Sequence, residues 1–66
     1  MSEAVKLIVD SYVSLKDRKA IEDLHEHRQL LRQRLEEKAG AWFDTSFLVG
    51  LIDEDIKAIE AGLTRL

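Results

Sequence analysis

Two apolar stripes that are interrupted at the same depth constrain the fold of this chain more than any other feature. Each stripe has four members at spacings of three, four or seven residues, which places them on one face of an α-helix. The members are Ile21, Leu24, Leu31 and Leu35 in the first stripe, and Leu48, Ile52, Ile59 and Leu63 in the second. One further position of each pattern carries a charge instead, Arg28 in the first and Asp55 in the second. The two segments, about 15–38 and 45–65, are therefore predicted to be amphipathic helices.

The residues between the two stripes predict a short turn. Proline is absent from the 66 residues, and glycine occurs only three times. Gly40 stands where a helix C-terminal glycine is expected, and Asp44 is placed to cap the next helix. Phe43 and Leu48 flank that cap with the spacing of a hydrophobic staple. The other two glycines lie inside the last helix, where a missing side chain lets another backbone approach closely.

Across this turn the stripes are predicted to pair as an antiparallel hairpin. Residues equally distant from the middle of the turn face each other, which joins Leu35 with Leu48, Leu31 with Ile52, Leu24 with Ile59, and Ile21 approximately with Leu63. The same rule places Arg28 opposite Asp55. A lone buried charge is costly, whereas a guanidinium and a carboxylate can form a charge-assisted pair. We expect this pair to fix the register of the hairpin, as buried polar residues do in coiled coils.

An N-terminal helix over about 3–13 is predicted from the apolar spacing of Val5, Ile8, Tyr12 and Leu15. This register does not continue into the middle helix, so the pattern breaks between Leu15 and Ala20. Ser14, followed three residues later by Asp17, resembles a capping box. Either a new helix begins there, or one long helix changes register.

The apolar content exceeds what a chain of this size can bury alone. Hydrophobic residues make up 45% of the sequence, and the absence of cysteine excludes disulfides as a stabilising device. We therefore predict one small all-α domain over 1–66, a three-helix or dimeric helical bundle, with a homodimer preferred. The expected partner or dimer surface consists of Leu30, Trp42, Phe43, Phe47, Leu51 and Ile56.

The candidates for chemistry are weak. His25 and His27 are two residues apart and point to different sides of a helix, although Glu22 and His25 have the Glu-x-x-His spacing of di-iron bundles. No cysteine nucleophile and no glycine-rich phosphate loop occurs, so we predict no enzyme activity, no catalytic residue, no metal and no cofactor.

Charge and hydropathy limit the partner classes. Residues 16–38 carry seven Lys/Arg against six Asp/Glu, and residues 39–66 carry two against five, a balance that suits two segments lying against each other. The interleaved acids disfavour a nucleic-acid surface, which needs a face of one sign. Nothing approaches the roughly 18 apolar residues of a membrane span, and no signal peptide is recognisable, so a cytoplasmic protein is expected.

A small protein–protein interaction or regulatory module, acting as a helical-bundle dimer, is the function that these patterns favour. A nucleic-acid-associated regulator using the arginine-bearing middle helix is the alternative from another class. The helical hairpin with its heptad-like last segment, IKAIEAGLTRL, also resembles type III secretion needle co-chaperones. That resemblance implies a small secretion-type co-chaperone as a further alternative.

Overall fold

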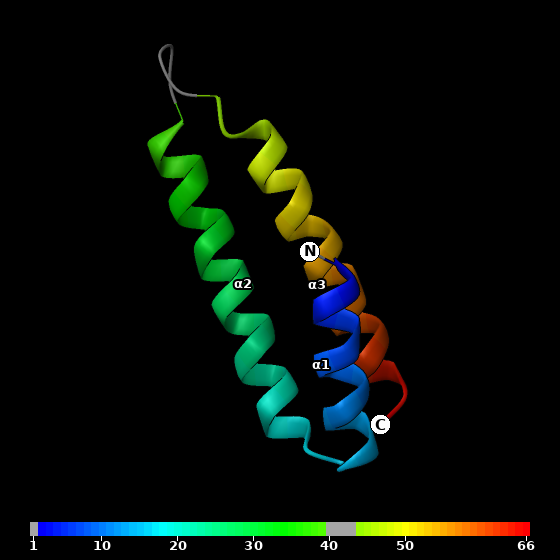
Figure 1. Cartoon of the computed structure of the whole chain (residues 1–66). Coiled ribbons are helices and arrows are strands. Elements are labelled where there is room, and N and C mark those ends of the chain that lie inside the picture. The colour runs from blue at the N-terminus through cyan, green and yellow to red at the C-terminus, as the bar shows by residue number, and fades with distance from the viewer. Residues whose placement is uncertain (1, 40–43) are drawn as a thin grey trace.

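The computed structural model describes residues 2–39 and 44–66, and these fold into helices without any strand (Figure 1). α1 spans Ser2–Ser14, α2 spans Arg18–Lys38 and α3 spans Ser46–Thr64. The predicted all-α fold, with a hairpin and an additional N-terminal helix, is confirmed. Helix α2 begins three residues later than predicted, because the break after α1 is a complete helix end.

Helices α2 and α3 form the antiparallel hairpin, and α1 covers only one half of it. Figure 1 shows α1 beside the half of α3 that is remote from the turn between α2 and α3, so the turn end of the hairpin has no third helix. The molecule is elongated, with extents of 44 × 19 × 15 Å. This arrangement follows from length, since α1 has 13 residues whereas α2 and α3 have 21 and 19.

The core lies where the three helices meet. Its buried side chains are Val5, Val9, Ile21 and Ile59, one or two from each helix. Gly62 lets α1 and α3 approach closely here, because a Cβ at this position would overlap Cγ1 of Val9. The close approach expected at the glycines of this helix is present at Gly62, where the neighbour is the Val9 side chain and not a backbone. It is absent at Gly50, where an added Cβ would have no atom within 4 Å.

A Schellman motif separates α1 from α2. The Lys16 amide donates to the Val13 carbonyl at 3.0 Å and the Asp17 amide donates to the Tyr12 carbonyl at 2.9 Å. These are the two bonds that define the motif, and Lys16 takes the left-handed conformation, with φ of 55°. A new helix therefore begins here, and the alternative of one long helix is wrong.

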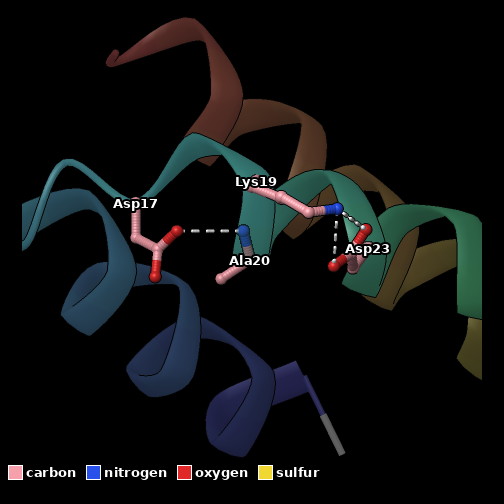
Figure 2. A network of polar contacts seen from close by, with 4 residues as sticks. All are labelled: Asp17, Lys19, Ala20 and Asp23. Atoms are coloured by element: carbon pink, nitrogen blue, oxygen red, sulfur yellow. Dashed lines mark hydrogen bonds and ion pairs between the residues drawn. The ribbon is translucent and has the colours of Figure 1, made fainter.

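Asp17 caps α2, which corrects the predicted capping box. Its carboxylate accepts a hydrogen bond from the Ala20 amide at 3.1 Å (Figure 2), so Asp17 is the N-cap and Ser14 is the last residue of α1. Lys19 and Asp23, one turn apart, form an exposed ion pair at 3.4 Å on the same helix (Figure 2). Such a pair adds only a few tenths of a kcal/mol, whereas a cap contributes about 1 kcal/mol.

Asp44 binds the first turn of α3, as predicted, although the helix begins at Ser46. Its carboxylate accepts a hydrogen bond from the Ser46 amide at 2.9 Å. This bond, together with one from the Ser46 hydroxyl, lowers the pKa of Asp44 below its ordinary value. The predicted helix end at Gly40 and the staple residue Phe43 lie outside the described residues.

Two predicted core positions are exposed. Leu31 and Leu48 are 37% and 43% exposed, while Ile21, Ile52 and Ile59 are buried. The other three predicted core residues are half-buried: Leu24, Leu35 and Leu63. The physical reason is the shortness of α1, which covers the hairpin near Ile21 and Ile59 but does not reach Leu31 and Leu48. A two-helix hairpin by itself cannot enclose its apolar stripe.

Candidate interaction surface

Arg28 and Asp55, the two charged residues in the stripes, face each other across the hairpin. The Arg28 Nε lies 3.4 Å from an Asp55 Oδ atom, and the Asp55 side chain is 1% exposed against 20% for Arg28. Neither carboxylate oxygen of Asp55 accepts a hydrogen bond of good geometry from the described residues. A carboxylate buried in this way loses hydration that a long ion pair only partly replaces. The pair therefore adds little to stability, and its predicted role in fixing the register stays a prediction.

One further ion pair and one histidine–carboxylate contact cross between α2 and α3 on either side of this central pair. Arg32 Nε lies 2.6 Å from Asp53 Oδ1, and His25 Nε2 lies 3.4 Å from Glu60 Oε2. The hydrogen bond and charge of Asp53 raise the pKa of Arg32 further above its ordinary value. All three nitrogen-bearing side chains belong to α2 and all three carboxylates to α3, in agreement with the unequal charge of the two segments. These contacts join the two helices at three levels of the hairpin.

A hollow of about 230 Å³ opens in the half of the hairpin that α1 leaves bare. We call it the distal groove, and its lining is entirely aliphatic: Leu31, Leu35, Leu48, Leu51 and Ile52. The groove lies on the same face of the hairpin as α1. Leu31 is one heptad beyond Leu24, and Leu51 is one heptad before Ala58, and both Leu24 and Ala58 pack against the core that includes α1. The groove is thus continuous with the surface of the hairpin against which α1 packs.

The outward face of α1 is a second apolar surface. Leu7, Ile8 and Leu15, here named the outer stripe, are 68%, 44% and 73% exposed. Ile8 and Leu15 belong to the apolar pattern that predicted this helix, and both are exposed. Val9 faces inward instead, because the close approach of α3 at Gly62 admits a short side chain there. Because α1 carries apolar residues on two sides, its sequence allowed either side to face the hairpin.

Only some residues of the predicted partner surface are exposed. Leu30 and Phe47 are exposed, whereas Leu51 and Ile56 are half-buried. Trp42 and Phe43 lie outside the described residues. The outer stripe was missed in that set, and one of its members, Leu7, belongs to no predicted stripe.

The polar groups of α2 are mostly engaged with one another. Arg18 pairs with Glu22 at 3.9 Å, and the Arg28 guanidinium also lies 2.6 Å from Nδ1 of His27. Glu22 and His25, the residues with di-iron spacing, therefore contact different partners. Among residues 2–39 and 44–66, no three side chains of the metal-ligating kinds gather in one place.

Two of the arginines on which a nucleic-acid surface would depend are also engaged. Arg28 and Arg32 face carboxylates of α3, and Arg32 contacts Glu36 on its own helix as well. Paired guanidiniums have less capacity to bind phosphates, since each must first leave its acid. No observation on the described residues favours this alternative.

None of the three described helices is long and apolar enough to cross a membrane. The chain matches no protein-family model, no curated protein and no solved structure.

Proposed function

We propose that this chain is a small, non-enzymatic interaction or regulatory module that acts as a helical-bundle dimer in the cytoplasm. The observation that carries the proposal is the distal groove, an aliphatic hollow on the hairpin. Leucines left in water on one face are typical of proteins that complete their core with another chain.

The surface area supports the same proposal. A compact monomer of 7.6 kDa exposes about 4300 Å². This chain exposes 4845 Å², because it is elongated and its groove is open. The excess is of the same order as the ~800 Å² that each partner of a standard interface buries.

Sedimentation equilibrium at micromolar concentration tests the dimer directly. We expect the mass of a dimer for the native chain and a shift toward the monomer for Leu31→Asp, which places a charge in the groove. Gln29→Asp is the matched control, because it adds the same charge at an exposed position of the same helix. A native chain that sediments as a compact monomer would contradict the proposal, and so would equal dissociation of the two variants.

Regulatory action through another protein is tested with the same pair of variants. A partner recovered with the native chain and with Gln29→Asp, but lost with Leu31→Asp, supports binding through the apolar face. Retention on heparin or duplex DNA that salt abolishes would instead favour the nucleic-acid alternative.

A further inference from the structure

One face of this molecule has a raised half and a recessed half. Helix α1 lies against the half of the hairpin that is remote from the turn (Figure 1), where its Val5 and Val9 pack with Ile21 and Ile59. The side chains of its outer stripe are exposed. The other half of the same face is the distal groove. A helix with its side chains is about 10 Å thick, so the step between the two halves is about one helix deep.

We propose that the outer stripe of a second copy of this chain occupies the distal groove, and that each copy fills the groove of the other. This inference deepens the proposed dimer and rests on it. The two chains are related by a twofold axis that is perpendicular to the helices, so that their hairpins run in opposite directions. Such an operation places the raised half of one copy on the recessed half of the other, at two identical contacts.

A parallel dimer would not satisfy the same surfaces. If the two hairpins pointed the same way, α1 would meet α1 of the partner, and the two raised halves would hold the hairpins apart. The distal grooves would then face each other across a gap about as wide as a helix. The aliphatic lining would remain in water, and the solvent exposure of Leu31 and Leu48 would be unchanged.

The chemistry of the outer stripe suits an aliphatic groove. Leu7, Ile8 and Leu15 are apolar, and Ser11 lies between them on the same face of α1. The Ser11 hydroxyl donates to the Leu7 carbonyl at 3.0 Å, so its hydrogen-bonding capacity is met within its own helix. Ser11 can therefore lose water without leaving its hydroxyl donor unpaired.

The lengths also agree. Helix α1 has 13 residues and is therefore about 20 Å long. The part of α2 beyond Arg28, which borders the groove, has ten residues and is about 15 Å long. One α1 thus spans one groove from end to end, with its C-terminal end near the turn of the partner.

Cross-linking tests this arrangement, because the chain has no cysteine of its own. Leu7→Cys chains are mixed with Leu48→Cys chains and treated with a short bis-maleimide. We expect a covalent heterodimer. The control replaces Leu48→Cys by Lys57→Cys, which is exposed on α3 and outside the groove lining, and it should give little product. Cross-linking of Leu48→Cys chains with one another, without the Leu7–Leu48 product, would overturn the arrangement.

A second variant separates the contact from folding. Leu7→Asp leaves the core of the single chain intact, since Leu7 is 68% exposed. We expect it to weaken the dimer at least about tenfold while the helical circular dichroism of the monomer persists. If the native chain and Leu7→Asp dimerised equally well, the α1 contact would be refuted, but the proposed function would stand. A native chain that is monomeric would refute the dimer itself.

Discussion

The close approach of α1 and α3 at Gly62 gives a sharp test of the packing. In Gly62→Ala, the new Cβ would overlap Cγ1 of Val9 and lie 3.6 Å from its Cβ. Val9 is fully buried, and a β-branched side chain has few alternative rotamers. The overlap can therefore be relieved only if α1 moves away from α3. Gly50→Ala makes the same chemical change on the same helix at a position with nothing within 4 Å.

The magnitude follows from two opposing effects. Alanine stabilises a helix interior by about 1 kcal/mol relative to glycine. Overpacking of a filled core costs about 1–3 kcal/mol. We therefore expect Gly62→Ala to lower the free energy of unfolding by about 1 kcal/mol and Gly50→Ala to raise it by a similar amount. The difference of about 2 kcal/mol corresponds to about 10 °C in Tm for a domain of this size.

Urea unfolding followed by far-UV circular dichroism measures both variants. All samples need the same protein concentration, because the stability of a dimer depends on it. The midpoint should fall for Gly62→Ala and rise for Gly50→Ala at an unchanged m value.

A double variant identifies the cause of the loss. Val9→Ala removes the atom that Gly62→Ala would strike, so the two changes together should cost less than the sum of their separate costs. If Gly62→Ala were as stable as Gly50→Ala, or if the costs were additive, the tight contact between α1 and α3 would be refuted.

Three further predictions concern the charged pair and the helix ends. Arg28→Leu leaves the Asp55 carboxylate buried without a partner and should cost about 3 kcal/mol in urea unfolding, more than Asp55→Leu, because the partly exposed Arg28 can reach water. If the double leucine variant kept its fold and its oligomeric state, the pair would have no role in register. Lys16→Gly should raise the Tm, since glycine removes about 1 kcal/mol of left-handed strain; a lower Tm would refute the Schellman assignment. The hydrogen bonds that lower the pKa of Asp44 stabilise the fold above the ordinary carboxyl pKa, and this contribution disappears as pH falls through the lowered value. The stability difference between the native chain and Asp44→Asn should therefore shrink in acid titrations, and a difference independent of pH would contradict it.

The hairpin was predictable because its information is local. Period and turn signals identify the helices before any contact is known, and antiparallel pairing follows from the short turn. The same arithmetic brought Arg28 and Asp55 together, since two charges at one depth of two stripes have few other partners. The structure places them 3.4 Å apart.

The orientation of α1 was not predictable in this way. The apolar residues of α1 lie on two sides, so periodicity alone allows either Ile8 or Val9 to face the hairpin. Which one does depends on the surface of α3, where Gly62 leaves room for a short side chain. The outer stripe became visible only after that choice was made.

The sequence by itself determined that this chain is helical, that α2 and α3 form a hairpin, and that Arg28 and Asp55 face one another. These properties depend on spacing along the chain and on backbone preferences, which every residue carries with it. Only the tertiary structure decided that α1 covers half of the hairpin, that Val9 is inside and Leu7 outside, and that Leu31 and Leu48 stay open to water. Burial depends on how far one helix reaches along another and on how closely their surfaces fit, and neither is a property of a single segment.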